Sequence, residues 1–199
     1  MLNVGLTGNI AAGKSAVAEL FRGWGATIID ADRLTREVQT PGSPVLREIA
    51  TRFGGDVLGP DGTLDRPALR RRVMADPAAL AELNRIVHPA VYRRRAELLA
   101  EARARGDRIV VSDIPLLFEA ADPAEFDAIV LVDAPETVRR DRLMTHRGLS
   151  AEEAGRMIAA QAPSGPKRAR STFVIDNDGD LPMLEAQARA VWDRLVARA

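Results

Sequence analysis

The residues with the clearest chemical meaning lie between Gly8 and Ser15, near the amino end. This segment, GNIAAGKS, matches the spacing G-x-x-x-x-G-K-[ST] at every fixed position. Its glycines let the backbone bend so that several N–H groups face one concavity, and a following helix adds its free N–H groups and its dipole. The Lys14 ammonium can then reach the outer phosphates of a nucleotide, and the Ser15 hydroxyl can bind Mg²⁺. The pattern predicts a nucleotide site formed by Gly8, Asn9, Ile10, Ala11, Ala12, Gly13, Lys14, Ser15 and Ala16.

Aspartates follow two of the expected strands at the point where each strand ends. Asp30 and Asp32 come after the apolar residues 27–29, and Asp113 comes shortly after residues 109–111. Ligands of open parallel sheets bind beyond the carboxyl ends of the strands, so these side chains should gather near the nucleotide site. Phosphoryl transfer needs a metal ion and a group that orients or deprotonates the acceptor hydroxyl. We therefore assign Asp113 to the metal and Asp32 to the acceptor.

Each of these aspartates also has a structural interpretation. Asp32 would cap the helix that is expected to begin near Arg33. Asp113 would be a turn residue at the end of a strand, and Asp30 fits a structural role as well as a site role. Asp133, which precedes Ala-Pro, is interpreted as a turn residue.

Residues 142–170 are rich in arginine and form the candidate lid over the phosphates. Ser150-x-x-Glu153 is a capping box, which predicts the start of a helix. Arg142 and Arg147 on such a lid would approach the nucleotide. A closed lid would also exclude water, which competes as a phosphoryl acceptor. The alternative interpretation is a solvated basic face.

The surrounding pattern is that of an α/β protein with a parallel sheet. Leu2, Val4 and Leu6 alternate with small or polar residues, and continuous apolar runs typical of buried parallel strands recur along the chain. An amphipathic helix should follow the glycine-rich segment, and another should close the chain. The expected strands lie at residues 2–6, 27–29, 109–111, 129–132 and 173–175.

The stretch from Arg33 to Gly106 has a mainly helical pattern and is interpreted as a helical insertion in the α/β core. Breaks are expected at its prolines and glycines, including Pro89. His88, directly before this proline, is explained as well by a helix end as by a substrate contact. Residues 163–166, Pro-Ser-Gly-Pro, are interpreted as a loop.

Composition narrows the class of protein. The 199 residues include 28 basic and 28 acidic side chains, and the formal net charge of zero argues against a general nucleic-acid or membrane-surface binder. Cysteine is absent, which removes thiolate chemistry and disulfides and fits a cytoplasmic location. No apolar run approaches the length of a membrane span. The only lysines are Lys14 and Lys167, so the chain lacks the Asn-Lys-x-Asp element by which familiar GTPases read their base.

Longer strings of this sequence resemble those of the dephospho-CoA kinase family, and the similarity covers nearly the whole chain. The DAD and DIPLLFE strings are far more specific than the glycine-rich segment alone. The resemblance is carried by Gly5–Ser15, Ile29–Asp32, Arg36–Val38, Gly62–Arg66, His88-Pro89, Asp113–Glu119, Arg142–Met144, Gln161 and Val174–Asn177.

The resemblance implies a P-loop kinase fold, in which helices flank a five-stranded parallel sheet. It implies a nucleotide-binding core at residues 1–32 and 107–199, with the lid at about 142–170, and a helical CoA-binding subdomain at 33–106. The implied reaction is transfer of the ATP γ-phosphoryl group to the 3′-hydroxyl of dephospho-CoA, the last step of coenzyme A synthesis.

The resemblance also implies roles for single residues. Asp32 would be the general base, Ser15 would bind Mg²⁺ with Asp113, and Lys14 and Asn177 would contact ATP. At least half of residues 115–118, Pro-Leu-Leu-Phe, should pack in the core. Contacts to the acceptor are implied for Asp30, His88, Pro115, Leu116 and Leu117. The implied partners are ATP and dephospho-CoA, with no protein partner, nucleic acid or membrane.

The chain departs from the usual family residues at a few positions. Ala11, Ala12 and Ala16 stand in place of glycine, serine and threonine. Alanine at position 11 would be strained if the loop needed a positive φ there. His146 stands at the usual lid arginine, beside Arg147, so either side chain is a candidate phosphate clamp, and a histidine clamp would respond to pH.

Two alternatives to this function follow from the sequence. One is another small-molecule or nucleotide kinase of the same fold. The other is a nucleotide-controlled switch protein, which the missing base-reading element disfavours.

Overall fold

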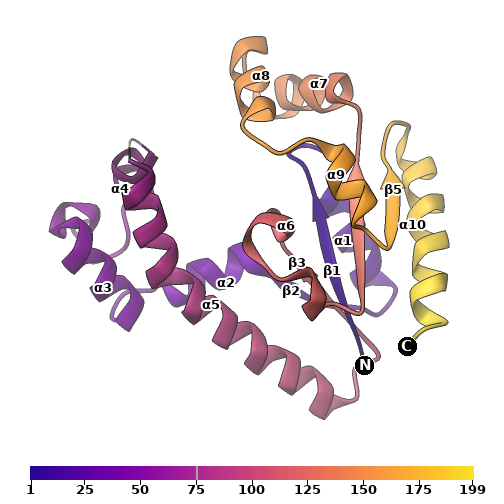
Figure 1. Cartoon of the computed structure of the whole chain (residues 1–199), viewed down its shortest axis with the longest axis horizontal. Coiled ribbons are helices and arrows are strands. Elements are labelled where there is room, and N and C mark those ends of the chain that lie inside the picture. Colours follow the sequence, from indigo (N-terminus) through magenta and orange to yellow (C-terminus); the bar gives the residue numbers. More distant parts are fainter. Residues whose placement is uncertain (75) are drawn as a thin grey trace. The chain divides into compact units, whose positions relative to one another are not determined.

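The structure is a computed structural model that describes residues 1–74 and 76–199 of the chain. Its contacts divide the chain into two units, residues Met1–Ile29 with Glu101–Ala199, and residues Asp30–Ala100. The first unit holds the sheet and the glycine-rich segment, and the second is helical (Figure 1). Each unit has a hydrophobic core of its own.

A five-stranded sheet with the order β2-β3-β1-β4-β5 is the centre of the first unit. Its strands are β1 (Leu2–Gly8), β2 (Thr27–Asp30), β3 (Ile109–Asp113), β4 (Ala128–Asp133) and β5 (Phe173–Asp176). Strand β1 pairs in parallel with β3 and β4, and β4 pairs in parallel with β5. The expected strands and the parallel sheet are confirmed. The register places the end of β1 beside the ends of β3 and β4, so the residues that follow these strands meet at one edge of the sheet.

Helices cover both faces of this sheet. The amphipathic helices expected after the glycine-rich segment and at the end of the chain are confirmed, and the rings of Phe21, Trp24 and Trp192 meet where these two helices pack together. The helices of the first unit are α1 (Lys14–Gly23), α6 (Leu117–Ala120), η2 (Pro123–Glu125), α7 (Glu136–Arg147), α8 (Ala151–Ala159), α9 (Ser164–Ala169) and α10 (Leu181–Val196).

Alternating side chains of the strands serve the two faces. Val130 and Val132 of β4 join the large core that lies under α1 and α10. Ile129 belongs instead to a separate cluster with Leu117 and Phe126. This period of two is a property of the extended chain, whose successive side chains point to opposite faces.

The second unit is built from helices around a small core. Its elements are α2 (Ala31–Val38), α3 (Pro44–Phe53), η1 (Gly55–Val57), α4 (Arg66–Met74) and α5, which spans Pro77–Arg105 and continues past the boundary between the units. The core is aliphatic apart from one phenylalanine and consists of Val45, Ile49, Phe53, Val57, Leu69, Val73, Ile86 and Val87.

Pro89 does not break a helix, so this expectation from the sequence is wrong. Helix α5 begins at Pro77 and continues past Pro89 to the end of its 29 residues. A proline inside a helix removes one backbone hydrogen bond and crowds the preceding turn. Ile86 and Val87 are buried before it, and Val91 packs against the same core after it. Burial on both sides of the proline therefore outweighs the local penalty.

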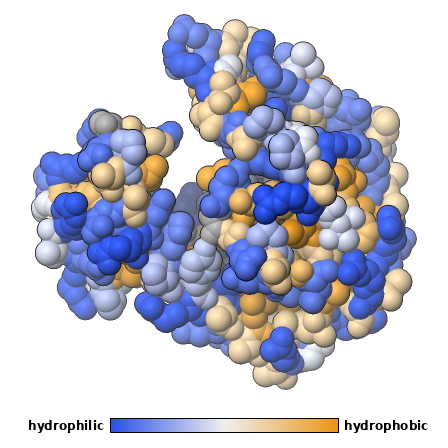
Figure 2. Space-filling view, in the orientation of Figure 1, coloured by the Kyte–Doolittle hydropathy of each residue, from blue (hydrophilic) through white to orange (hydrophobic). Residues whose placement is uncertain are grey.

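Hydrophilic and hydrophobic residues are interspersed on the visible face of each unit (Figure 2). Leu116 and Tyr92 are among the large apolar or aromatic side chains that are exposed. In the part of the chain that the structure describes, no helix combines the length and the apolar character needed to cross a bilayer.

Replacing Pro89 by alanine should stabilise the chain, because alanine restores a helical N–H and relieves the crowding inside α5. We expect the free energy of unfolding to rise by about 1 to 3 kcal/mol, measured by urea denaturation. Pro44→Ala is the matched control, since Pro44 is the first residue of α3, where proline is tolerated. That variant should gain no stability. An unchanged or lower stability of Pro89→Ala would contradict the explanation.

Candidate active site

The glycine-rich segment forms a bend between the last residue of β1 and the first residue of α1, as expected. Gly13, the residue before α1, has a φ of 99°. A Cβ atom on Gly13 would lie 2.0 Å from Nδ2 of Asn177, which donates a hydrogen bond of 2.8 Å to the Ala12 carbonyl. Both the backbone conformation and the close approach of this amide require glycine at position 13.

Ala11 also has a left-handed backbone, with a φ of 58°. It is the one non-glycine residue with a positive φ among residues 1–74 and 76–199. The left-handed conformation brings Cβ close to the following carbonyl oxygen, so alanine is strained here. The strain considered from the sequence is thus present in the structure.

Lys14 and Asp113 form an ion pair at the sheet edge. The Asp113 carboxylate is buried at the end of β3, and the register of the sheet sets it opposite Leu6 of β1. Ser15 follows Lys14 in the first turn of α1, where its side chain is exposed. A hydroxyl and a carboxylate are hard oxygen ligands of the type that Mg²⁺ prefers. Among the described residues, no group of three or more acidic or histidine side chains is arranged to hold a metal ion.

Arg142 of α7 joins the bend to the turn after β5. Its guanidinium donates to the Asn177 carbonyl at 3.1 Å and to the Asn177 side-chain oxygen at 3.2 Å. Longer contacts of 3.4 and 3.5 Å reach the carbonyls of Ala11 and Ala12. Arg142 and Asn177 are both candidate site residues from the sequence, but nothing in the sequence indicated that they contact each other. Arg147, the other selected arginine, is exposed in the last turn of α7.

The candidate lid packs against the bend through apolar side chains. Leu143 of α7 and two residues of α8, Ala154 and Ile158, are buried together, and Ile10 and Ala11 of the bend pack against them. The capping box predicted at the start of α8 is confirmed, because Ser150 and Glu153 exchange both hydrogen bonds. The capping box therefore sets where α8 begins, and the buried apolar side chains hold α8 against the bend.

The segment that follows α8 bonds the other side of the bend, and no pattern in the sequence indicated these contacts. The side-chain oxygen of Gln161 accepts a 2.7 Å hydrogen bond from the Ile10 amide. The side-chain Nδ2 of Asn9 donates to the Ala162 carbonyl at 3.3 Å and to the Ser164 hydroxyl at 3.2 Å. Residues 163–166, expected to be a loop, instead contain the start of α9 at Ser164. Pro166 lies in the first turn of α9, where proline is tolerated because the missing N–H would have no acceptor inside the helix.

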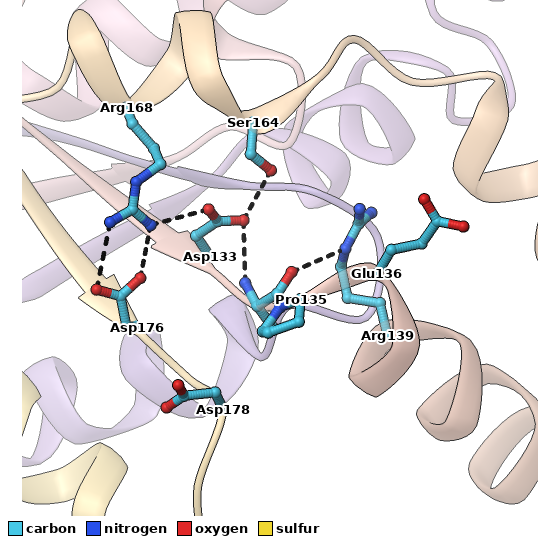
Figure 3. A pocket seen from close by; sticks show the side chains of 9 residues that line it. Asp133, Pro135, Glu136, Arg139, Ser164, Arg168, Asp176 and Asp178 are labelled. Carbon is cyan, nitrogen blue, oxygen red and sulfur yellow. Dashed lines mark hydrogen bonds and ion pairs between the residues drawn. The ribbon is translucent and has the colours of Figure 1, made fainter.

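An ionic network anchors α9 to the ends of β4 and β5 (Figure 3). Asp133 accepts hydrogen bonds from Ser164 at 2.8 Å and from Arg168 at 3.0 Å, and Arg168 also pairs with Asp176. Hydrogen bonds to Asp176 and Asp133 raise the pKa of Arg168 further above its usual range, so the guanidinium stays charged. Asp133 also accepts from the Ala134 amide at 3.0 Å, as the turn interpretation predicted, but its larger role is to hold α9. A cavity of about 290 Å³ lies beside this network.

The DIPLLFE segment supplies packing as well as an exposed surface. Leu117 has no exposed area and packs with Phe126, so it is one of the core residues expected in this segment, and its contact with the acceptor stays a prediction. Leu116 exposes 45% of its surface. The Pro115 carbonyl accepts a 3.1 Å hydrogen bond from the Thr7 hydroxyl, which ties this segment to β1.

In the second unit, Asp30 and not Asp32 caps α2. The Asp30 carboxylate accepts a 3.0 Å hydrogen bond from the Arg33 amide. Asp32 lies in the first turn of α2 with its side chain exposed, so the capping interpretation of Asp32 is wrong. His88 is half-buried in α5, and its ring meets that of Tyr92 edge-on, with 6.0 Å between centroids.

Replacing Ala11 by glycine should stabilise the chain, because glycine adopts a φ of 58° without steric penalty. We expect the free energy of unfolding to rise by about 1 kcal/mol, measured by urea denaturation. Ala12→Gly is the matched control, since Ala12 is buried and has no positive φ. That variant should lose about 1 kcal/mol through the lost methyl group and the freer unfolded chain. Equal changes at both positions would contradict the assignment of strain to Ala11.

Comparison with known proteins gives a consistent result. A family model described as dephospho-CoA kinase matches residues 2–183. The chain is 48% identical to a dephospho-CoA kinase of Streptomyces avermitilis over 199 residues, which is all of this chain and 96% of that protein. It is 47% identical to a dephospho-CoA kinase of Anaeromyxobacter dehalogenans over 194 residues, which is 98% of this chain and 90% of that protein.

The fold agrees with that of a solved structure at similar coverage. A crystal structure of the Thermus thermophilus protein TT1252 superposes with a TM-score of 0.83 at 38% identity, covering 98% of this chain and 97% of that one. The match of the family model and the identity to these relatives both extend over nearly the whole chain. The chain belongs to the dephospho-CoA kinase family, whose members are kinases that transfer a phosphoryl group to an alcohol.

Proposed function

We propose that the chain transfers the γ-phosphoryl group of ATP to the 3′-hydroxyl of dephospho-CoA with the help of Mg²⁺. The observation that carries the proposal is the ion pair of Lys14, which ends the bend, with Asp113, which ends β3. The pair combines a cation suited to nucleotide phosphates with a carboxylate suited to a metal ion. Both lie at the sheet edge where ligands of such folds bind.

The bend would bind the phosphates mainly through main-chain amides. In the first turn of α1 the Ala16 and Val17 amides donate to the Gly13 carbonyl, so the amides of Lys14 and Ser15 would be the ones to bind phosphate. The helix dipole adds positive potential at the same place. Lys14 would exchange its contact with Asp113 for the outer phosphates of ATP. Such groups stabilise the charge that spreads over the oxygens of the transferred phosphoryl group.

Ser15 and Asp113 are the residues that would hold Mg²⁺. Mg²⁺ commonly takes one or two oxygen ligands from the protein and the rest from phosphates and water, and this donor set fits that pattern. The bound ion would neutralise charge on the phosphate oxygens. Asp113 is beside Lys14, so the two positive charges that act on the phosphates, the Lys14 ammonium and the Mg²⁺ ion, would lie close together.

Asp32 is the proposed general base. It follows β2 by two residues, its carboxylate is exposed, and the capping of α2 is done by Asp30. The carboxylate is therefore available to accept the proton of the attacking 3′-hydroxyl. Removing that proton makes the oxygen a better nucleophile as the bond to the γ-phosphorus forms.

His88 and Leu116 are proposed contacts of the acceptor. His88 is a partly exposed polar group, and Leu116 offers exposed apolar surface for the pantetheine arm. The candidate lid would close over the phosphates and keep water from acting as the acceptor. In the last turn of the first lid helix α7, His146 and Arg147 are both exposed, and either could contact the phosphates. A cytoplasmic location remains a prediction.

Incubation with Mg-ATP and separate acceptors tests the reaction. We expect dephospho-CoA to be converted to coenzyme A, with ADP formed in equal amount, and nucleoside monophosphates to remain unmodified. Chelation of the metal should abolish the reaction, because the phosphate charge would no longer be neutralised. Phosphorylation of nucleoside monophosphates alone would support the alternative of a nucleotide kinase. ATP hydrolysis without transfer to any acceptor would support the switch protein.

Replacing Asp32 by asparagine should lower kcat by about 10²- to 10⁴-fold, because an amide cannot accept the proton of the hydroxyl. The Kd of ATP, measured by calorimetry without the acceptor, should remain close to that of the wild type. Asp56→Asn removes another exposed carboxylate of the second unit and should leave kcat unchanged. A kcat of Asp32→Asn equal to the wild-type value would remove Asp32 from the chemistry.

A further inference from the structure

Lys167, the second of the two lysines in the chain, is buried beside the phosphate-binding bend. Only 4% of its side chain is exposed, although it lies in the short helix α9 that follows the candidate lid. Lysine is rarely buried unless its ammonium group is paired. A buried lysine is therefore expected to have a specific role in its surroundings.

The ammonium group of Lys167 has two partners from different segments. It donates a hydrogen bond of 2.8 Å to Oδ1 of Asn9, inside the bend. It forms an ion pair of 2.8 Å with Glu119, whose side chain is 36% exposed, at the end of the DIPLLFE segment. The Nζ atom of Lys167 thus connects helix α9 with the bend, through Asn9, and with the DIPLLFE segment, through Glu119.

The contact with Asn9 fixes the orientation of that side chain. Oδ1 of Asn9 accepts from Lys167, and its amide group donates to the Ala162 carbonyl and the Ser164 hydroxyl. With both ends of the side-chain amide bonded, the amide cannot rotate. The backbone carbonyl of the same residue accepts a 3.0 Å hydrogen bond from the Ala12 amide, which closes the first turn of the bend.

We propose that Lys167 is a positioning residue for the phosphate site, acting through Asn9 to hold the bend in the shape that binds the phosphates of ATP. Glu119 compensates the buried charge. The proposal rests on the proposed binding of ATP by the bend. Small displacements of groups that must surround a phosphate cost large factors in affinity or rate, so a residue that touches no substrate can still control binding.

The competing explanation is that Lys167 only anchors α9. Removing it would then lower stability, and any loss of ATP affinity would follow from general loosening. The two explanations differ when the ion pair is replaced as a whole. Replacing both members of a buried pair by apolar side chains is often neutral for stability, whereas Oδ1 of Asn9 would still lack its donor.

The first measurement compares Lys167→Met with the wild type. We expect the Kd of ATP, measured by calorimetry without any acceptor, to rise by about 10- to 100-fold, with a lower Tm. Arg156→Met is the control, because it also removes a cation between residues 142 and 170 but from an exposed position that is paired only within α8. Its ATP affinity should equal that of the wild type.

The second measurement separates positioning from stability. The double variant Lys167→Met with Glu119→Met should recover most of the lost Tm but retain the weakened ATP affinity. Recovery of both properties would overturn the proposal and leave Lys167 as an anchor. Because this double variant leaves no unpaired buried charge, it also serves if Lys167→Met alone fails to fold.

A double-mutant cycle tests the route through Asn9. Asn9→Ala should weaken ATP binding by itself, and adding Lys167→Met to it should weaken binding by less than about threefold more, because the shared path is already lost. Independent, multiplying effects would overturn the proposal. If the wild type bound no ATP at all, the proposed function would fail first. If the wild type bound ATP and Lys167→Met bound it with the same Kd, only the role of Lys167 would be refuted.

Discussion

The structure depends on a bend of the main chain at residues 9–13, whose shape is held largely by side chains from other segments. Between β1 and α1 the backbone leaves the sheet, turns through left-handed conformations at Ala11 and Gly13, and must keep several amides pointing inward. These residues take part in no strand pairing, and of their amides that of Ile10 donates to the Gln161 side chain and that of Ala12 to the Asn9 carbonyl. The shape therefore has to be imposed by neighbouring side chains. Asn177 and Arg142 bond the carbonyls on one side of the bend, and residues 161–167 bond Asn9 and Ile10 on the other.

The same side chains connect the bend to both ends of the candidate lid. Arg142 lies on α7, the first lid helix, and Gln161 follows α8, the second. Ile10 packs into the small apolar cluster between these helices. Residues that would contact the phosphates and the helices that would cover them are thus packed on each other. A movement of the lid would change the packing around the bend, and a nucleotide in the bend would favour one arrangement of the lid.

The two lysines illustrate how the chain distributes positive charge. The other basic residues of the sequence are arginines. Lys14 pairs with Asp113 at the end of β3, and Lys167 bonds Asn9 inside the bend. A compact ammonium group can donate in several directions from one atom, which suits a site where partners converge. Arginine presents a planar fork and serves where two acceptors lie side by side, as Asp133 and Asp176 do for Arg168.

The strands, the bend and the capping box could be predicted from the sequence because each depends on local chemistry, namely alternation of apolar residues, glycine spacing, and a serine three residues before a glutamate. The selection of Lys14 and Ser15 followed from the spacing of the glycine-rich segment, and that of Asp32 and Asp113 from the rule that ligands bind at strand ends. Interactions between distant segments could not be predicted in this way, because no local pattern encodes the contact of Lys167 with Asn9 or of Arg142 with Asn177. Burial in the tertiary structure decided that Leu117 is a core residue and that α5 continues through Pro89, since both depend on apolar surface supplied by other elements.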